Sequence, residues 1–589
     1  VSFVDINNDG FQDIYLSKTM VGEIKYRENV LLVNNKNNTF TNKAKEYGIA
    51  DAGYSNQSVF FDYDNDGDLD LYVLNHRADF DNALTIYDTE AAKGNIIPSS
   101  VFWRDEYSDK LYRNNGNNTF TDVSKKAGII NNDFSLSAVP SDLNGDGFVD
   151  LYIANDFASK DHAYINQGNG TFKDELEERF GHIPSSSMGM DIADYNNDGY
   201  PDVVNLDMTP ENNYRQKQLK GASSYDKYQL GLDFGFYHQI SRNMLQLNNG
   251  DGTFSEIGQL ANIAYTDWSW SSLFADFDND GWQDLFISNG HHKDITDLDY
   301  LKYRSMEAVT AAGGNDHVKA LDLINLMTST KISNYMYANN KDLKFSDQTK
   351  SWGLDQLSHS NGSAYVDLDL DGDLDLVVNN FNQEAFLYRN NAREQNKGNY
   401  LAISLNGNDG NKHGFGAKVK IKTATGNQFR EVTPYRGFLS SVDQNLHFGL
   451  GTDEKILELE IIWPNGKNQI IKNIEVNQKI KLSIADASTY YKLNATNNKL
   501  FTNKGNLVNY THKENSFIDF KQEPLLEHFL SNKGPVILVG DVNGDTLEDF
   551  YIGGSADESG TLYIQKTGST FSKKEVSSFI EDKKHEDAG

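Results

Sequence analysis

The sequence has no cysteine, no long apolar run and little positive charge. With no cysteine among 589 residues, disulfides, thiolate metal sites and cysteine nucleophiles are excluded, and the redox compartment stays open. No uninterrupted apolar stretch approaches the roughly 18 residues that a membrane-spanning helix needs, so we expect no transmembrane segment. Lys and Arg number 54 against 85 Asp and Glu, and the formal net charge is -31. Such an excess of negative charge repels phosphate backbones and disfavours nucleic acid as a partner.

Signatures of the common enzyme classes are also missing. The chain contains no GxSxG, HExxH, Walker A or Rossmann glycine pattern. Histidine is scarce at 13 residues, and the best isolated candidate for a transition-metal or acid–base site is His291 and His292 beside Asp294. Such pairs are more often packing or surface features. We therefore predict a protein that is not an enzyme.

What the chain has instead is a nine-residue repeat. The pattern DxDxDGxxD, with Asn allowed at the third position, occurs six times before residue 395, and a seventh copy has Thr546 in place of the glycine. Acidic or amide side chains at positions one, three and five wrap oxygen ligands around Ca²⁺, and the glycine permits a sharp turn. An EF-hand would need Glu at position twelve, where this chain has strand residues such as Val73. Position nine supplies the fourth carboxylate here.

These loops predict calcium sites, about one ion for each loop. Ligands that are all oxygen favour Ca²⁺ over zinc or copper, and flexible loops favour it over Mg²⁺. A hairpin turn with solvated acids would explain one copy, but six full copies at equivalent positions argue against that alternative. In loop order the predicted ligands are Asp5, Asn7, Asp9 and Asp13; Asp62, Asp64, Asp66 and Asp70; Asp142, Asn144, Asp146 and Asp150; Asp194, Asn196, Asp198 and Asp202; Asp276, Asp278, Asp280 and Asp284; Asp367, Asp369, Asp371 and Asp375; and Asp541, Asn543, Asp545 and Asp549.

Each loop lies between two strand-like runs, and a second tight hairpin with Asn-Gly or Asp-Gly follows many copies, as in LYRNNGNNTF from Leu111. Repeated units of four antiparallel strands are typical of a β-propeller. The longer insertions, residues 76–109, 207–243 and 290–334, all fall between the second and third strands of their units. We therefore expect them on the face opposite the Asp loops, with helical turns on either side of residues 313–314 in the last one.

Two known families resemble this chain. Residues 1 to about 395 resemble FG-GAP/VCBS repeat proteins, which are calcium-loop propellers related to integrin α-chain heads. Those propellers usually have seven blades, so the resemblance implies one more blade upstream of Val1. The segments HGFGAKVKI from His413, YRGFLSSVDQNLHFGLG from Tyr435 and IIWPNGK from Ile461 resemble the ASPIC/UnbV domain. The combination is similar to bacterial relatives of the cartilage acidic protein family.

The resulting prediction is an all-β chain in four parts. We expect a calcium-loop propeller of the seven-bladed type with six blades present, then a small β-rich domain, a linker, and the start of a second propeller. Both ends are expected to be truncated. The boundaries are 1–397 for the first propeller, 398–485 for the ASPIC/UnbV-like domain, 486–535 for the linker and 536–589 for the first blade of the second propeller.

The predicted function is binding or adhesion outside the cytoplasm. Millimolar extracellular calcium suits open loops of this kind, so the expected location is extracellular, on the cell surface or in the periplasm of a bacterium. Trp103, Trp268 and Trp270 are candidates for the recognition face, since aromatic side chains suit both glycan stacking and protein contacts. The rival from another class is a propeller-type polysaccharide lyase or hydrolase.

A weaker alternative is RNA binding through the ASPIC/UnbV-like domain. Residues 398–485 hold 11 Lys and Arg against 8 Asp and Glu, a net charge of +3. The domain has no RNP-type aromatic motif, and solvated lysines on an ordinary strand face explain the charge equally well. The candidate patch consists of Lys418, Lys420, Lys422, Arg430 and Arg436.

Overall fold

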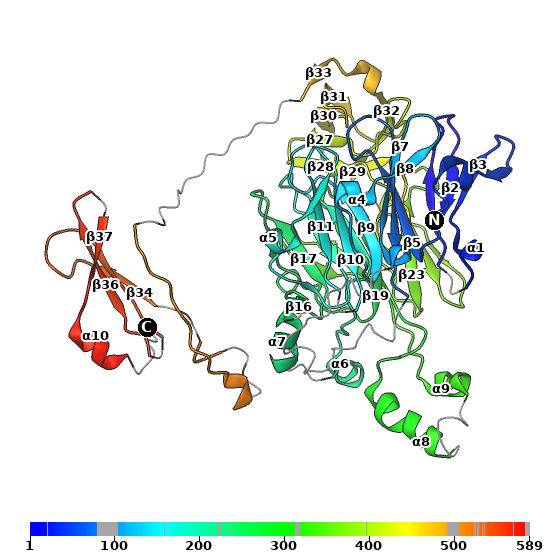
Figure 1. Ribbon diagram of the computed structural model, residues 1–589. Coiled ribbons are helices and arrows are strands. Elements are labelled where there is room, and N and C mark those ends of the chain that lie inside the picture. The colour runs from blue at the N-terminus through cyan, green and yellow to red at the C-terminus, as the bar shows by residue number, and fades with distance from the viewer. Residues whose placement is uncertain are drawn as a thin grey trace. The chain divides into compact units, whose positions relative to one another are not determined.

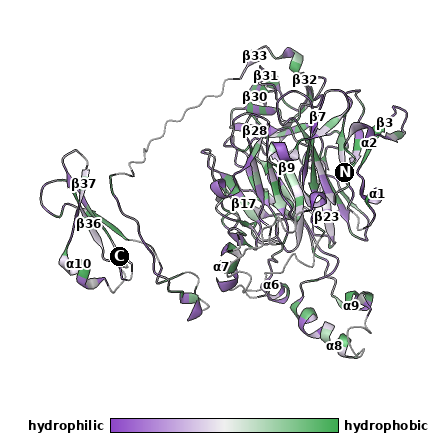
Figure 2. Ribbon diagram, in the orientation of Figure 1, coloured by the Kyte–Doolittle hydropathy of each residue, from purple (hydrophilic) through white to green (hydrophobic). Residues whose placement is uncertain are grey.

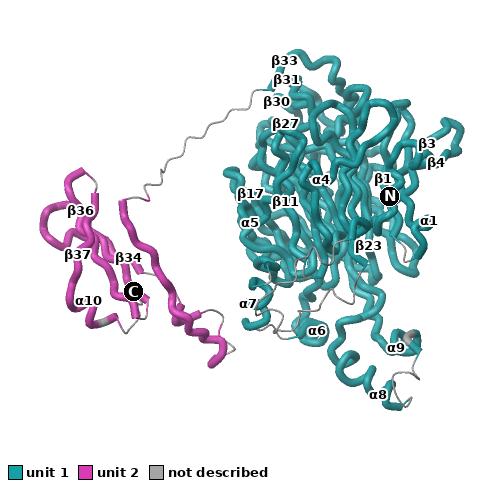
Figure 3. Tube along the Cα trace, viewed as in Figure 1, with its two compact units in different colours: residues 1–493 teal, residues 494–589 magenta. Residues whose placement is uncertain are grey.

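The computed structural model divides into two compact units, Val1–Leu493 and Asn494–Gly589, each described by itself (Figures 1 and 3). No helix among the described residues is both long and apolar enough to cross a membrane. The structure describes residues 1–19, 22–78, 104–157, 159–221, 225–233, 235–311, 319–395, 397–491, 505, 507–523, 526, 529–532, 534, 536–555, 557–568 and 570–583.

Six antiparallel sheets built from consecutive strands make up most of the first unit. Five have four strands and the sixth has three, which confirms the prediction of an all-β, propeller-like chain with six blades. The sheets are β1 (Ser2–Val4), β2 (Asp13–Leu16), β3 (Val30–Asn34) and β4 (Phe40–Asn42); β5 (Ser55–Phe61), β6 (Asp70–Asn75), β7 (Lys110–Asn114) and β8 (Phe120–Asp122); β9 (Ser135–Ser141), β10 (Asp150–Asn155), β11 (His162–Asn166) and β12 (Phe172–Asp174); β14 (Met190–Ala193), β15 (Asp202–Asn205), β17 (Met244–Asn248) and β18 (Phe254–Glu256); β19 (Ser269–Ala275), β20 (Asp284–Asn289), β21 (Tyr335–Asn339) and β22 (Phe345–Asp347); and β23 (Ser360–Val366), β24 (Asp375–Asn380) and β25 (Phe386–Tyr388).

The Asp loops join the first and second strands of each sheet, as predicted. Position nine of each loop is the first residue of the second strand, for example Asp70 in β6, which pairs with Phe61 of β5. The first strands of successive sheets contact one another, so the sheets follow each other in chain order. Among these inner strands, β9 is buried on both faces along its whole length. Small polar residues share this buried strand with apolar ones, as its sequence SLSAVPS shows.

The insertions gather at the end of the blades opposite the Asp loops (Figure 1). Helices lie on both sides of residues 313–314, which confirms the helical turns predicted there. In the first insertion, residues 79–103 lie outside the described residues, and Trp103 with them. The insertion elements are α6 (Asn213–Leu219), α7 (Tyr225–Asp233), β16 (Gln239–Ile240), η3 (Asp105–Tyr107), η4 (Tyr300–Arg304), α8 (Ser305–Ala311) and α9 (Ala320–Leu326); β16 pairs with β13 (Ile183–Pro184), and the short helices α1 (Ile24–Arg27), α2 (Ala44–Tyr47), α4 (Ser124–Ala127) and α5 (Leu176–Arg179) lie beside the blades.

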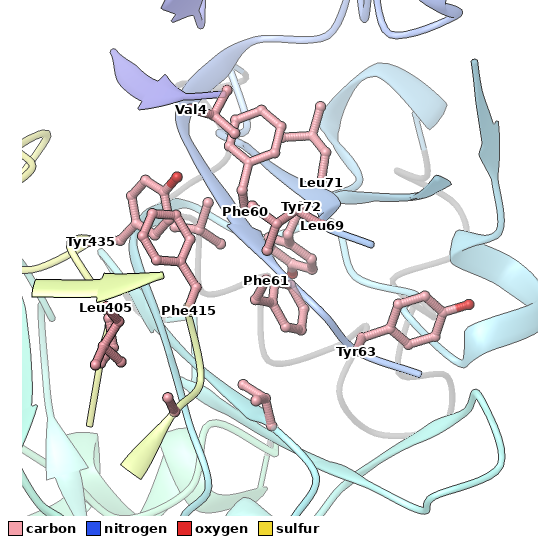
Figure 4. Packing of buried hydrophobic residues seen from close by; sticks show 14 of the residues in the cluster. Val4, Phe60, Phe61, Tyr63, Leu69, Leu71, Tyr72, Leu405, Phe415 and Tyr435 are labelled. Atoms are coloured by element: carbon pink, nitrogen blue, oxygen red, sulfur yellow. The ribbon is translucent and has the colours of Figure 1, made fainter. Parts of the chain in front are cut away.

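The segment that follows the sixth sheet forms two small sheets packed on the Asp-loop end of the blades (Figure 1). Figure 4 shows Leu405, Phe415 and Tyr435 in one apolar cluster with Val4 and Phe60 of the first two blades. The propeller and this segment therefore share a core and form one compact unit. The strands are β26 (Asn399–Asn406), β29 (Leu446–Gly451) and β32 (Gln478–Ser483) in one sheet, and β27 (Lys418–Lys422), β28 (Asn427–Glu431), β30 (Lys455–Ile462), β31 (Lys467–Glu475) and β33 (Thr489–Tyr490) in the other, followed after β32 by η6 (Ile484–Asp486).

A connection of this segment, residues 432–443, lies on the axis that the blades surround. Gly437 exchanges backbone hydrogen bonds with Met190 of β14 and accepts one from Ser137 Oγ of β9. A Cβ on Gly437 would lie 2.2 Å from Ser271 Oγ of β19, so only glycine fits there. We call residues 432–443 the axial segment.

The axial segment also contacts the inner strands at the two ends of the series. The hydroxyl of Tyr435 donates to the Phe3 carbonyl of β1 at 3.4 Å, and the Asp443 N–H approaches the Tyr365 carbonyl of β23 at 3.5 Å. One stretch of the ASPIC/UnbV-like segment therefore touches first strands from the beginning to the end of the propeller.

The second unit contains one four-stranded sheet, which agrees with a single further blade. Its Asp loop again joins the first two strands. The elements are η7 (Asp519–Lys521), β34 (Ile537–Gly540), β35 (Asp549–Ile552), β36 (Thr561–Lys566), β37 (Thr570–Lys574) and α10 (Ser577–Asp582).

The axial segment is held by a buried ion pair, and this generates a stability prediction. Arg436 Nη1 lies 2.9 Å from Asp191 Oδ1, and both side chains are almost inaccessible to solvent. Replacing Arg436→Met leaves a buried carboxylate without its cation, so we expect a loss of about 3 to 5 kcal/mol in urea denaturation followed by tryptophan fluorescence. The matched control Lys472→Met breaks an exposed pair with Glu458 and should cost less than about 1 kcal/mol. Equal losses in the two variants would contradict a locking role for the axial pair.

Candidate metal centres

The carboxylate at position one of every Asp loop is held by backbone N–H groups. In loop two, Asp62 accepts from Asp66 N on Oδ1 at 3.1 Å and from Gly67 N on Oδ2 at 3.0 Å. The same two bonds recur in the other six loops. Each oxygen of Asp62 thus uses one lone pair on the backbone and keeps another for a ligand.

The turn itself requires left-handed backbone at positions four and six. In loop two, Asn65 has φ of 57° and Gly67 has φ of 95°. Asn and Gly are the residues that adopt this region at low cost. In loop seven, Thr546 adopts φ of 70° and still donates to Asp541 at 2.8 Å. The loop shape therefore survives the substitution, although a β-branched residue there costs about 1 to 2 kcal/mol.

The carboxylate at position nine connects each loop to the second hairpin of its blade. Asp70 is fully buried and accepts from Tyr63 N at 3.2 Å and from Asn114 N, at the end of β7, at 2.7 Å. Equivalent pairs of bonds occur in all seven blades. Position nine therefore has a structural role in addition to the ligand role predicted from the sequence.

Sequence reasoning missed the asparagine at the end of each third strand. Asn166 Nδ2 donates to the Val149 carbonyl of its own loop at 3.1 Å and to the Tyr63 carbonyl of the preceding loop at 2.7 Å. Asn248, Asn339 and Asn390 make the same pair of bonds. These asparagines tie neighbouring Asp loops together, and the recurring Asn before each Asn-Gly-type turn was the signal that pointed to them.

The predicted ligands converge in three loops. Carboxylate oxygens lie within 4.8 Å of one another at Asp62, Asp64 and Asp66 in loop two, at Asp276, Asp278 and Asp284 in loop five, and at Asp367, Asp369 and Asp371 in loop six. Loops two, five and six are the ones with aspartate at position three. Loops one, three, four and seven have asparagine there and so present one carboxylate fewer. A further group, Asp371, Asp373 and Glu394, adjoins loop six.

Burial and mutual repulsion make these carboxylates costly to ionise without a cation. Burial and, to a smaller extent, the charges of Asp66 and Asp64 raise the pKa of Asp62 to about 7, although backbone hydrogen bonds act in the opposite direction. Burial likewise raises the pKa of Asp194 to about 7. Burial and then the charges of neighbouring carboxylates raise the pKa of Asp276 and Asp284 well above the usual range. A divalent cation bound to oxygen ligands would remove this repulsion, and the ligand types present fit Ca²⁺.

The pKa shifts predict how stability depends on pH when divalent ions are removed. For Asp62 the pKa rises from 3.8 to about 7 on folding, so the folded chain binds more protons between these values. Stability of the metal-free protein should therefore fall as pH rises from about 4 to about 7. Calcium removes this penalty, and its stabilising effect should grow over the same interval. Calorimetry of resin-stripped and calcium-loaded protein at constant ionic strength measures both curves; a metal-free protein that gains stability with rising pH would contradict the assignment.

The candidate RNA patch is corrected by the structure. Lys418, Arg430 and Arg436 face the propeller: Lys418 contacts Asp142, Arg436 pairs with Asp191, and the buried Arg430 interacts electrostatically with Asp194 and Asp276. These three charges lie against the Asp loops and the blades. Of the candidate patch, Lys420 and Lys422 remain toward solvent. Those two lysines line a cleft of about 320 Å³ beside loop four, together with the acidic side chains of Asp194, Asp198, Glu458 and Glu460. A phosphate backbone would meet both signs of charge there.

Of the histidines and tryptophans singled out in the sequence, Trp268, Trp270 and His291 lie together. Trp268 stacks on His291 with ring centroids 4.3 Å apart, and Trp270 donates from Nε1 to the Gly290 carbonyl at 2.9 Å. Asp294 accepts from Arg215 at 2.9 Å and from two threonine hydroxyls, so its carboxylate holds the insertion loops together. In the described residues around it, Asp294 therefore works as a loop anchor rather than as a partner of His291 and His292.

Comparison with known proteins gives two families. Residues 1–73, 101–153, 142–204 and 234–287 match the FG-GAP-like repeat, and residues 407–489 match the ASPIC and UnbV family. Among solved structures, the Tc holotoxin pore of Photorhabdus luminescens matches with 11% identity and a TM-score of 0.22, covering 73% of this chain and 15% of that chain. A TM-score this low supports no conclusion about structure or function.

Cartilage acidic protein 1 is similar to this chain in three animals. The Mus musculus protein is 22% identical over 498 residues, which cover 82% of this chain and 64% of that protein. The Xenopus tropicalis protein is 23% identical, with 79% and 61% covered, and the Homo sapiens protein is 22% identical, with 82% and 62% covered. The chain thus spans less than two thirds of the length of these curated relatives. It combines FG-GAP-like repeats with an ASPIC and UnbV domain and is homologous to cartilage acidic protein 1 over most of its own length.

Proposed function

We propose that this chain is an extracellular binding module whose propeller is stabilised by calcium. The observation that carries the proposal is the convergence of three carboxylates in loops two, five and six, on a turn whose backbone already holds position one in place. Millimolar calcium outside the cytoplasm suits open hairpin loops, which supports an extracellular, cell-surface or periplasmic location. A bacterial source remains a prediction from the sequence.

In this proposal calcium acts on structure rather than on the ligand directly. The Asp loops face the ASPIC and UnbV sheets, and contacts such as His447 Nε2 to Asn279 Oδ1 at 2.7 Å cover loop five. A Cβ on Gly410 would lie 2.2 Å from the Gly67 carbonyl of loop two, so the two backbones are in close contact there. Bound ions would therefore rigidify the blades beneath this segment, and a partner would bind elsewhere.

The insertion face is the proposed binding surface, and a protein is the proposed partner. Several large apolar side chains are exposed on η4, α8 and α9, where apolar residues alternate with polar ones (Figure 2). Tyr303, Met306 and Leu321 are each about two thirds exposed, at 67%, 65% and 65%. Exposed aromatic and Met side chains of this kind are typical of protein interfaces. Glycan binding through Trp268 is less favoured because His291 covers one face of its ring.

The metal proposal predicts stoichiometric calcium uptake that depends on individual loops. Titration calorimetry on resin-stripped full chain should show several sites, and Asp66→Asn in loop two should remove one of them. Each lost site lowers stability by about 2.7 kcal/mol when free calcium is 100 times Kd, which a melting curve detects. The control Asp342→Asn removes the same charge from an exposed hairpin and should change neither quantity. No uptake by the wild-type chain would refute the calcium proposal.

The binding proposal predicts that partner capture depends on the insertion helices. The full chain, with Met306→Lys and Leu321→Lys as the test variant, is compared with wild type on arrays of secreted proteins and of glycans, with and without calcium. We expect protein ligands that bind the wild type only in the presence of calcium. The variant should bind them at least about tenfold more weakly, which corresponds to a loss of about 1.4 kcal/mol of binding free energy. The control Leu387→Lys, at a residue of β25 that is also 65% exposed but lies outside the Asp loops and the insertions, should bind normally. Turnover of a polysaccharide by the purified chain would overturn the non-enzymatic assignment.

A further inference from the structure

The third Asp loop differs from the others in the cation that lies against it. Lys418 is the first residue of β27, and its Nζ contacts Asp142 Oδ2 at position one of loop three. The side chain of Asp142 is 1% exposed and that of Lys418 is 17% exposed. This contact joins the ASPIC and UnbV sheet to the interior of an Asp loop.

The acceptor positions of Asp142 are all in use. Oδ1 accepts from Gly145 N at 2.8 Å and from Asp146 N at 3.1 Å, while Oδ2 accepts from Gly147 N at 2.8 Å and from Lys418 Nζ. A carboxylate has about four lone-pair sites. Asp62 in loop two receives only the two N–H bonds from positions five and six, so it retains acceptor sites that Asp142 has lost.

Lys418 is held in place from a second side. Glu431 lies directly opposite it on β28, and the Glu431 carboxylate accepts from Ser141 Oγ at 2.6 Å and from Asp142 N at 3.4 Å. The charge of Glu431 acts on the ammonium together with that of Asp142, so carboxylates of both the loop and its own sheet stabilise it. Moving it into solvent would leave Glu431 and Asp142 buried without a counter-charge.

Cations near other loops make longer contacts or are more exposed. Lys412 of the same segment donates to the Asn8 carbonyl of loop one, but its Nζ lies 3.7 Å from Asp5 Oδ2, beyond hydrogen-bonding distance, and its side chain is 29% exposed. Lys341 lies 2.9 Å from Asp280 of loop five, but its side chain is 47% exposed. Arg389 reaches Asp369 of loop six with a side chain that is 56% exposed. Long exposed side chains of this kind can turn into water when a metal ion arrives, at a cost of less than about 1 kcal/mol.

We propose that Lys418 is the resident cation of loop three and that this loop takes up no calcium. The inference rests on the proposed calcium binding by the other loops. Loop three keeps the turn and the carboxylates of a calcium loop, but a lysine supplied by the ASPIC and UnbV sheet replaces the ion. This contact then holds the two parts of the unit together at any calcium concentration.

The test compares the number of bound calcium ions in matched variants of the full chain by equilibrium dialysis and titration calorimetry. Asp66→Asn and Asp146→Asn alter position five of loops two and three in the same way. We expect Asp66→Asn to lose one bound ion and Asp146→Asn to lose none. Loss of one ion in both variants would overturn the inference while leaving the calcium proposal intact, whereas a wild type that binds no calcium would refute the proposal itself.

A second variant removes the lysine cation from loop three. Lys418→Met keeps most of the side-chain volume, and we expect it to bind one calcium ion more than wild type. Its melting temperature should fall in metal-free buffer and recover with calcium, because the ion then balances the buried carboxylates that the lysine no longer pairs with. The control Lys341→Met should keep the wild-type number of ions. An unchanged number in Lys418→Met, with the variant folded in calcium, would contradict the inference.

Discussion

The repulsion between buried carboxylates at the end of each blade is the constraint on which the structure depends. In loop two, position one and position nine are buried, where Asp62 and Asp70 orient the backbone of the loop and of the neighbouring hairpin. The same burial raises their pKa and makes the charged forms unfavourable. A fold that uses carboxylates as backbone acceptors in this way needs a positive charge nearby, from a metal ion or from a side chain.

The ASPIC and UnbV segment supplies part of this positive charge. It lies on the acidic end of the blades and directs Lys418 and Arg430 toward the loops, and Arg436 along the axis to Asp191. These positive charges of the segment therefore lie inside the unit and not on a surface that a partner could reach. The shared apolar core with the first two blades explains why the propeller and this segment fold as one compact body.

The sequence was informative where a local pattern fixes local geometry. The nine-residue repeat predicted the loops, the strand pairs around them and the face on which the insertions lie, because turn chemistry and pleat alternation act over a few residues. It could not predict that Lys418 and Arg436 point into the unit, since their partners Asp142 and Asp191 lie 276 and 245 positions away in the chain. The interblade asparagines were visible as a pattern, but their partners lie in the preceding blade, as with Asn166 and Tyr63.

The division of labour between the two ends of the blades follows from this packing. Every loop that joins first and second strands carries carboxylates. In the first unit, the ASPIC and UnbV sheets cover this end of the blades. A ligand therefore cannot approach the sites at Asp276 or Asp142 without displacing buried contacts. The turns between second and third strands do not contain the Asp loop, so they can lengthen without disturbing the blades. Insertions of variable size with exposed side chains such as Met306 accumulate there, which makes that face the part of the molecule free to evolve a partner.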